Sequence, residues 1–144
     1  MSREVRLARP ADMPAVYALR HEVFVVGQDV PAELERDEHD DLVDHGVAYV
    51  DGELRATGRL LPPETPAGAA TVGRMAVTAS ARGTGLGAAV LDLLEQTARE
   101  RGWRSVELHA QVHATGFYDR AGYQPVGEVY LEAGIEHLTM RKQL

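Results

Sequence analysis

The pattern of apolar positions predicts two principal helices. Between Asp12 and Phe24, apolar side chains recur at helical spacing, Pro14 falls in the first turn, and Asp12 can cap the start. The apolar members of this stripe, which we expect in the core, are Val16, Leu19, Val23 and Phe24. A second helix with a more regular apolar stripe is predicted from Gly85 to Arg101, and Gly102 ends it.

Shorter stretches of alternating or β-branched residues predict strands around these helices. Asp51-Gly52 tolerates positive φ and predicts the tight turn of a hairpin between residues 47–50 and 54–61. The other expected elements are strands at residues 5–7, 72–77, 106–110, 126–131 and 137–141, and a short helix at 114–120. This order predicts one mixed sheet with helices on its faces, an α/β (α+β) domain that covers residues 1–144.

Composition supports an ordinary globular domain and removes several other classes. The 144 residues are 44% hydrophobic and 26% charged, which excludes disordered, collagen-like and coiled-coil chains. A net charge of −7 lacks the basic footprint that neutralises phosphate backbones, so we expect no nucleic-acid partner. The absence of cysteine excludes disulfides and a thiolate nucleophile. No apolar run approaches the ~20 residues of a membrane span, so we expect a cytoplasmic protein without a membrane partner.

Most of the net charge lies in one acidic run. From Glu33 to Asp44, seven acids accompany a single arginine, Arg36, and give a local charge of −6. Such a run is too charged for a core, so we expect a loop or a short surface helix. Two interpretations remain open for it: a solvated face, or an attractive rim for a cationic amine.

The sharpest local motif is a glycine-rich turn between the strand that ends at Val77 and the second principal helix. Such a junction directs several backbone N–H groups and the positive end of a helix at one point, which suits a pyrophosphate. The spacing of Gly83, Gly85 and Gly87 matches neither a nucleotide P-loop nor the Gly-x-Gly-x-x-Gly of dinucleotide enzymes. Those two classes are therefore not favoured.

The turn contains Arg82-x-x-Gly85-x-Gly87, at the start of a helix that follows a strand. This motif resembles the Gln/Arg-x-x-Gly-x-Gly/Ala signature of the GNAT superfamily of acyl-CoA-dependent N-acetyltransferases. The segment from Gln111 to Tyr123 resembles its Asn-x-x-Ala-x-x-x-Tyr-x-x-x-Gly-Phe segment, with glutamine and tyrosine in place of the first and last residues. The resemblance implies a mixed, mostly antiparallel central sheet flanked by helices.

Flanking segments are similar to the ElaA-like branch of the superfamily, so the resemblance covers nearly the whole chain. They are residues 19–28, the acids Glu35, Asp37 and Asp40, His45, and residues 128–140. Gly27 stands where the branch usually carries an acid, so the acceptor pocket of the branch does not transfer directly to this chain. Arg20, Glu22 and Arg74 lie in segments that resemble the substrate side of the branch, and each also fits a surface or structural ion pair.

The resemblance implies acetyl-CoA as the acyl donor. The backbone of Met75, Ala76 and Val77 would pair with the pantetheine arm as if it were an added strand. The turn residues that would hold the pyrophosphate are Arg82, Gly83, Thr84, Gly85, Leu86 and Gly87. A backbone N–H near Val77 would polarise the thioester carbonyl. Gln111 would hydrogen-bond the donor in place of the usual asparagine, or it is a satisfied loop amide.

The implied chemistry is direct transfer of an acetyl group to an amine, which requires no covalent intermediate. Tyr118 occupies the family's tyrosine position and would protonate the departing thiolate as general acid. Glu128 and His137, on adjacent expected strands, are the candidates for the base that deprotonates the amine, directly or through water. His109 and His113 have a metal-like spacing, but a strand followed by a loop does not converge them, so we expect no metal.

The expected function is N-acetylation of a small-molecule or peptide amine, with two alternatives. The segments around Arg20 and Glu35 are also similar to acyl-homoserine-lactone synthases, but the only tryptophan, Trp103, lies outside the N-terminal half where those enzymes carry theirs. A non-catalytic module that binds acyl-CoA would keep the same motifs. A homodimer is compatible with the family, and nothing in residues 128–144 decides it.

Overall fold

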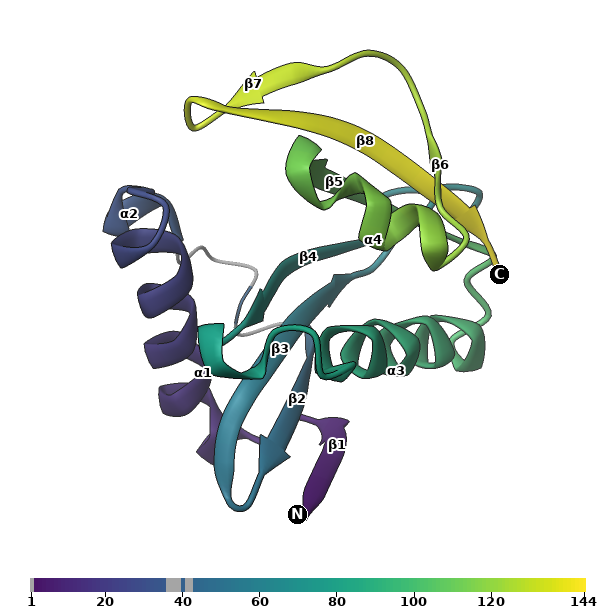
Figure 1. The fold of residues 1–144 in the computed structure, drawn as a ribbon. Helices are drawn as coiled ribbons and strands as arrows, with labels where there is room; N and C mark the ends of the chain where they lie inside the picture. Colours follow the sequence, from purple (N-terminus) through teal and green to yellow (C-terminus); the bar gives the residue numbers. More distant parts are fainter. Residues whose placement is uncertain (1, 36–39, 41–42) are drawn as a thin grey trace.

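The strands of the chain join in one sheet (Figure 1). The computed structural model describes residues 2–35, 40 and 43–144. The strands found there are β1 (Arg3–Leu7), β2 (Asp44–Val50), β3 (Glu53–Leu61), β4 (Ala70–Val77), β5 (Ser105–Gln111), β6 (Gln124–Pro125), β7 (Tyr130–Glu132) and β8 (Ile135–Gln143). Their order is β1-β2-β3-β4-β5-β8-β6, and β7 pairs with β8. All of these pairs are antiparallel except β4 with β5, which confirms the mixed, mostly antiparallel sheet.

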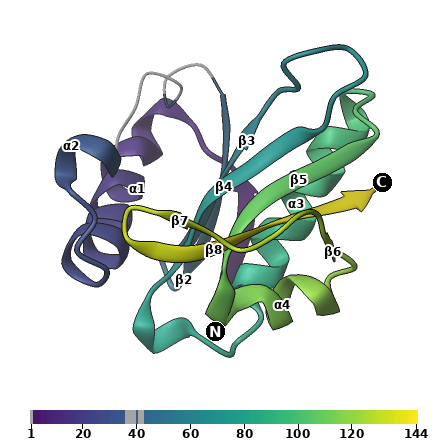
Figure 2. The same ribbon diagram turned by 90° about the horizontal axis from the view of Figure 1, so that it is seen from above.

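Helices cover both faces of the sheet. They are α1 (Met13–Arg20), which continues as a π-helical turn (His21–Val26), α2 (Ala32–Glu35), α3 (Leu86–Glu100) and α4 (Thr115–Arg120). Short 3-10 turns lie at Pro10–Asp12, Ala79–Ala81 and Val112–Ala114. Figure 2 shows α1 and α2 on one side of β2, β3 and β4, and α3 on the other side. Among the helices described, none is long and apolar enough to cross a membrane.

The core forms where α3 packs on the sheet. Four residues of the predicted stripe, Leu86, Val90, Leu94 and Ala98, are at most 2% exposed. The buried strand residues of the same cluster include Ala48, Ala56, Leu60, Val72, Val106 and Leu108. The predicted hairpin turn is confirmed, because Asp51 and Gly52 have φ of +50° and +83°.

The start of the first helix differs from the prediction. Asp12 stands at the N-cap of α1, but its carboxylate makes no capping hydrogen bond to the helix. It accepts instead from the backbone N–H of Arg9 at 2.7 Å, from the guanidinium of Arg6 at 2.7 Å and from the hydroxyl of Tyr49 at 2.6 Å. Asp12 therefore ties the start of α1 to β1 and β2.

The end of the first helix widens into a π-helical turn, which shifts the apolar stripe. Val16 and Leu19 are buried as expected, whereas Val23 and Phe24 are only half-buried. The extra residue per turn rotates these two side chains away from the face that α1 presents to the sheet. Just after the turn, a Cβ at Gly27 would lie 2.6 Å from the carbonyl oxygen of Val23, so the close backbone approach favours glycine here.

Part of the acidic run lies inside the protein, so the expectation of a purely surface segment is wrong. Glu35 and Asp40 are each 4% exposed. The fully buried guanidinium of Arg20 donates to both carboxylates, at distances between 2.6 and 3.2 Å. Arg20 is therefore a structural ion-pair residue. Residues 36–39, 41 and 42 of the run lie outside the described part of the chain.

The C-terminal strands differ from the prediction in their limits. The expected strand at residues 126–131 is reduced to β7, because Gly127 adopts φ of +83° and turns the chain out of the extended conformation. Val126 and Val129 are accordingly exposed rather than packed in a sheet. β8 is longer than expected, and its residues 137–143 pair with β5 along the full length of that strand.

Candidate active site

The central feature of the site is the point where β4 and β5 separate. Their parallel pairing covers only residues 70–72 against 106–108. β4 then continues to Val77 and β5 to Gln111 without pairing to each other. On the side facing β5, the backbone of residues 73–77 has no strand partner among the described residues, so an extended ligand arm can hydrogen-bond to it. The last three of these residues are the ones predicted to pair with pantetheine.

A β-bulge bends β4 at the same place. Arg74 has φ of +52°, and the register with β3 shifts between Thr57 and Arg59. Gly58 lies at the shift, where a Cβ would collide with Sδ of Met75. The Nε of Arg74 donates to the backbone carbonyl of Glu35 at 3.0 Å. The bulge therefore lies just past the point where β4 and β5 separate, and it contacts α2 through Arg74.

The glycine turn presents open backbone at the N-terminus of α3. Gly83 and Gly85 have φ of +78° and +86°, and a Cβ at either position would meet nothing within 4 Å. Gly85 is the N-cap, and no side chain caps the helix. The first N–H groups of α3 have no intrahelical partner, as at every helix start. Between Thr78 and Ala88 the only charged side chain is Arg82, so the turn suits an anionic group.

Three elements meet at Gly87, in the first turn of α3. A Cβ there would lie 3.3 Å from Cγ2 of Val77, at the end of β4, and 3.6 Å from Cζ of Phe117, on α4. Glycine therefore lets the strand, the turn and α4 approach one another. The two predicted motifs, far apart in the sequence, are neighbours at this point.

Tyr118, the predicted general acid, follows Phe117 on α4 in an aromatic cluster. Its ring packs edge-on against Phe117 at 5.0 Å and against Tyr123 at 6.0 Å between centroids. Tyr123 donates to Glu95 on α3 at 2.8 Å, which fixes the far side of the cluster. Burial among these groups raises the pKa of Tyr118 to about 12, so its hydroxyl is protonated at neutral pH.

Gln111 and His137 face each other on the other side of the gap. They are direct cross-strand partners in β5 and β8. The amide of Gln111 donates to Oε1 of Gln28 at 2.7 Å, which connects the end of β5 to the segment after α1. That contact favours the satisfied-amide interpretation of Gln111. His137 is buried and donates from Nδ1 to the carbonyl of Ile135 at 2.7 Å.

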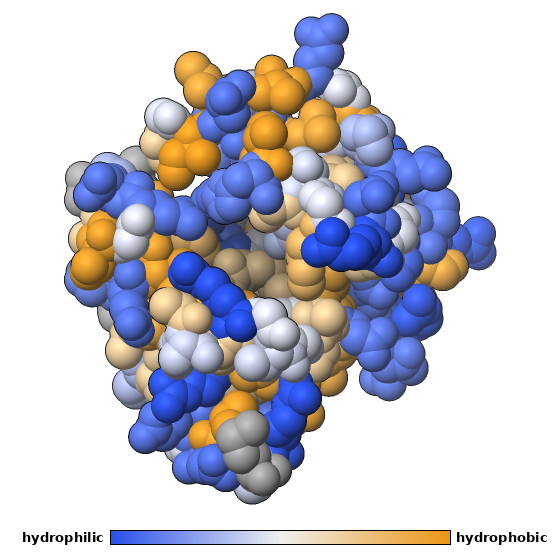
Figure 3. All heavy atoms as spheres, viewed as in Figure 1, coloured by the Kyte–Doolittle hydropathy of each residue, from blue (hydrophilic) through white to orange (hydrophobic). Residues whose placement is uncertain are grey.

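The two candidate bases differ in their surroundings. Glu128 lies in the exposed loop before β7, not in a strand as expected. His137 lies in β8, and the tip of the β7–β8 hairpin extends toward α2 in Figures 1 and 2. Figure 3 shows a hollow in the surface between this hairpin, the α1–α2 side and the α3–α4 side. His137, buried in β8 with its Nδ1 bonded to a backbone carbonyl, is therefore the candidate with a defined geometry.

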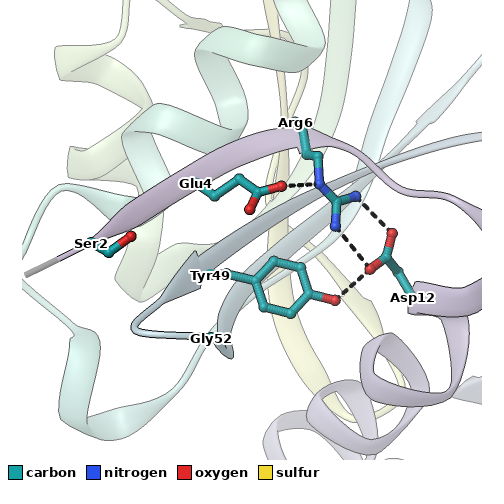
Figure 4. A pocket seen from close by; sticks show the side chains of 6 residues that line it. All are labelled: Ser2, Glu4, Arg6, Asp12, Tyr49 and Gly52. Carbon is teal, nitrogen blue, oxygen red and sulfur yellow. Dashed lines mark hydrogen bonds and ion pairs between the residues drawn. The ribbon is translucent and has the colours of Figure 1, made fainter.

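A polar pocket of about 290 Å³ lies elsewhere, between β1, β2 and the start of α1 (Figure 4). Its charged groups are bonded to one another: Arg6 pairs with Glu4 and Asp12, and Tyr49 donates to Asp12. The hydrogen bond from Arg6 holds the pKa of Asp12 far below its usual range. This network stabilises the fold, and we do not place the chemistry there. A smaller pocket of about 170 Å³ separates α1 from α2.

Gln28 and Tyr130 lie in segments that resemble the ElaA-like branch, but no site role was predicted for either residue. Gln28 is connected to the site by its hydrogen bond to Gln111, and Tyr130 by its cross-strand pairing with His137. Each depends on contacts that form only when the chain folds. Of the two histidines with metal-like spacing, His109 is hydrogen-bonded to Tyr130 at 2.6 Å, and the described residues contain no group of three or more metal-ligating side chains.

The family is decided by comparison with known proteins. The model of the acetyltransferase (GNAT) domain matches residues 12–144. The chain belongs to this family. ElaA of Escherichia coli is 33% identical over 90% of this chain and 86% of its own, and its crystal structure superposes with a TM-score of 0.86. The resemblance to the ElaA-like branch is thereby confirmed.

Two further structures support the same assignment for this acetyltransferase. An acyl-CoA N-acyltransferase from Pseudomonas aeruginosa is 38% identical, with a TM-score of 0.79 over 98% of this chain and 99% of its own. A Lactobacillus plantarum protein assigned to the N-acetyltransferases is 31% identical, with a TM-score of 0.91 over 100% and 99%. The chain is a GNAT-type N-acetyltransferase.

Proposed function

We propose that the protein transfers an acetyl group from acetyl-CoA directly to a primary amine of a small molecule or peptide. The observation that carries this proposal is the strand edge at residues 73–77, which leads to the uncapped glycine turn of α3. An edge for an extended arm and a helix N-terminus for a pyrophosphate are the two features that acetyl-CoA requires. The P. aeruginosa relative is itself described as an acyl-CoA enzyme.

In this proposal the chain's backbone holds the donor. Met75, Ala76 and Val77 bind the pantetheine arm along the open edge of β4, and residues 82–87 bind the pyrophosphate. Gln111 lies at the end of β5, on the opposite side of the same gap. An N–H near Val77 stabilises the negative charge that develops on the thioester oxygen during attack.

Tyr118 supplies the proton for the departing thiolate. Its ring packs edge-on against Phe117, which lies at the meeting point of β4, α3 and α4. The raised pKa keeps the proton on the hydroxyl until it is needed. The same apolar surroundings also destabilise the charged thiolate of CoA. Burial therefore disfavours both anions, the thiolate before the proton transfer and the tyrosinate after it. The amine attacks the thioester carbon, the C–N bond forms and the C–S bond breaks.

The first experiment is calorimetric titration of the protein with acetyl-CoA, with NADH and ATP at the same salt concentration as controls. Saturable heat with acetyl-CoA alone supports the donor. If acetyl-CoA produced no heat and did not compete with a fluorescent CoA analogue, the glycine turn would be purely structural and the proposal would fail. A positive result leads to an assay for CoA release with a panel of amines.

Tyr118→Phe then tests catalysis separately from binding. We expect kcat to fall by about 10²–10⁴-fold, the usual contribution of a positioned acid, with the Kd for acetyl-CoA unchanged. Tyr49→Phe is the matched control, because it removes a tyrosine hydroxyl in the β1–β2 pocket. A protein that binds acetyl-CoA but shows no turnover with any amine, before or after the substitution, would instead be a binding module.

A further inference from the structure

The sheet face opposite α3 carries a group of polar side chains from three strands. On β5 and β8 the core-facing positions, such as Leu108 and Met140, alternate with residues that face the other way. The residues on this second face include His109 and Gln111 from β5, His137 and Thr139 from β8, and Tyr130 from β7. They lie beside the gap that we assign to the acyl donor, on the face away from the glycine turn.

The neutral ring of His137 is held in one tautomer. Its Nδ1 lies 2.7 Å from the carbonyl oxygen of Ile135, and a carbonyl oxygen can only accept. The proton of the neutral ring is therefore on Nδ1, and Nε2 carries the lone pair. Nε2 lies 3.7 Å from a carboxylate oxygen of Glu132, which is largely exposed and can accept a proton from Nε2 and release it to water.

The ring of Tyr130 stacks on the ring of His137 and fixes its orientation. The two rings are stacked, with centroids 5.9 Å apart and an angle of 27° between their planes. The hydroxyl of Tyr130 is hydrogen-bonded to Nδ1 of His109 at 2.6 Å, and Thr139 also approaches His109, at 3.4 Å. One end of Tyr130 is thus anchored on β5 while its ring covers His137 on β8.

We infer that His137 is the general base of the acyl transfer and that Tyr130, anchored by His109, is its positioning residue. This inference rests on the proposed function. Nε2 of His137 takes a proton from the acceptor ammonium, directly or through one water, and leaves a neutral amine. The amine forms the C–N bond, the thiolate receives the proton of Tyr118, and the second amine proton restores the Tyr118 hydroxyl. The proton on His137 leaves through Glu132, so one proton is released per turnover.

Among the described residues, the titratable groups on the neighbouring strands that face His137 are Tyr130 and Glu132 on β7 and His109 on β5; the direct cross-strand partner, Gln111, does not titrate. From the segment after α1, the amide of Gln28 reaches this group through its hydrogen bond to Gln111. The alternative base, Glu128, is exposed in a loop and has no such arrangement.

The first test replaces the base. We expect His137→Gln to lower kcat by about 10²-fold or more, with the calorimetric Kd for acetyl-CoA unchanged. His113→Gln, an exposed histidine in the turn after β5, is the matched control and keeps full activity. Full activity in His137→Gln, together with loss of activity in Glu128→Gln, would assign the base to Glu128 and overturn the inference.

The second test concerns the anchor of Tyr130. We expect Tyr130→Phe and His109→Ala each to lower kcat about 3–10-fold and the double variant to be no worse than either, because both break one interaction. The KM for acetyl-CoA should stay constant, and the acidic limb of the pH–rate profile should shift. Additive losses, or losses confined to KM, would show that Tyr130 does not act through His109 on the base.

A third measurement does not depend on any variant. Nitrogen-15 NMR of the wild-type protein reports the tautomer of each histidine, and we expect His137 to carry its proton on Nδ1. A proton on Nε2 would overturn the inference. An enzyme that binds acetyl-CoA and depends on Tyr118 but not on His137 contradicts this inference alone, whereas failure to bind acetyl-CoA contradicts the proposed function.

Discussion

Tyr118 illustrates how one residue's surroundings set its chemistry. Its ring packs against Phe117, against Tyr123 and against the buried core. Removal from water disfavours the tyrosinate, so the pKa rises from about 10 to about 12. The protonated hydroxyl, which can donate a proton, predominates below the pKa. The raised pKa therefore keeps Tyr118 protonated up to a higher pH.

This shift predicts the pH dependence of tyrosinate formation. Between pH 8 and 10.5, wild type and Tyr118→Phe should show the same tyrosinate absorbance, because Tyr118 stays protonated. Ultraviolet difference titration measures this directly. A difference of about half a tyrosinate at pH 10 would mean an unshifted pKa. By the same argument, kcat with an acceptor amine that is already neutral should stay constant as the pH rises from 8 to 10.5.

At the scale of elements, the glycine turn can be tested against the other end of its own helix. Gly85 and Gly102 flank α3 with φ of +86° and +81°, and neither would contact a neighbour through an added Cβ. Alanine at either site incurs the same backbone strain of roughly 1–2 kcal/mol. Only Gly85 lies where the proposed pyrophosphate approaches the N-terminal amides.

We therefore expect Gly85→Ala and Gly102→Ala to lower the free energy of unfolding equally but to differ in binding. Gly85→Ala should raise the Kd for acetyl-CoA about tenfold, because the added Cβ would stand where the proposed pyrophosphate approaches the amides and would weaken a charge-assisted hydrogen bond. Gly102→Ala should leave Kd unchanged. Denaturation and calorimetry on both variants provide the comparison, and equal Kd values would remove the turn from the binding site.

The elements also show what the sequence could and could not predict. Regular patterns such as the α3 stripe and the Asp51-Gly52 hairpin were predicted correctly, because local chemistry decides them. The cap at Asp12 was wrong because Arg6 and Tyr49, from other strands, bind its carboxylate. Tyr118 and residues 75–77 remain site predictions made from motifs. The sequence assigned no role to Tyr130 or Gln28, because the contacts that link them to the site form only after folding.

At the scale of the whole molecule, one guanidinium joins the N-terminal elements to the site. Arg20 on α1 binds Glu35 at the end of α2 and Asp40, and Asp40 also accepts from Arg59 on β3 at 3.0 Å. The carbonyl of Glu35 accepts from both Arg20 and Arg74, and Arg74 forms the bulge of β4. The acidic segment is thus tied to the strand that we assign to the acyl donor.

Replacing Arg20 should therefore affect stability first and the site second. Arg20→Ala leaves two buried carboxylates without their main counter-ion, and we expect a loss of about 3–5 kcal/mol in the free energy of unfolding. Arg20→Lys should not restore it, because an ammonium cannot reproduce the forked contacts.

The matched control is Arg55→Ala, which breaks the exposed pair with Glu53 on β3 and should cost less than about 1 kcal/mol. Urea denaturation of the three variants measures the difference. The opposite outcome is an equal loss in the free energy of unfolding for Arg20→Ala and Arg55→Ala. The buried network of Arg20 would then not stabilise the fold, and its connection through Glu35 to Arg74 would not hold the bulge of β4. If the large loss is found, acetyl-CoA at a concentration well above its Kd should recover part of it in Arg20→Ala, because a ligand that binds only the folded protein stabilises it by mass action.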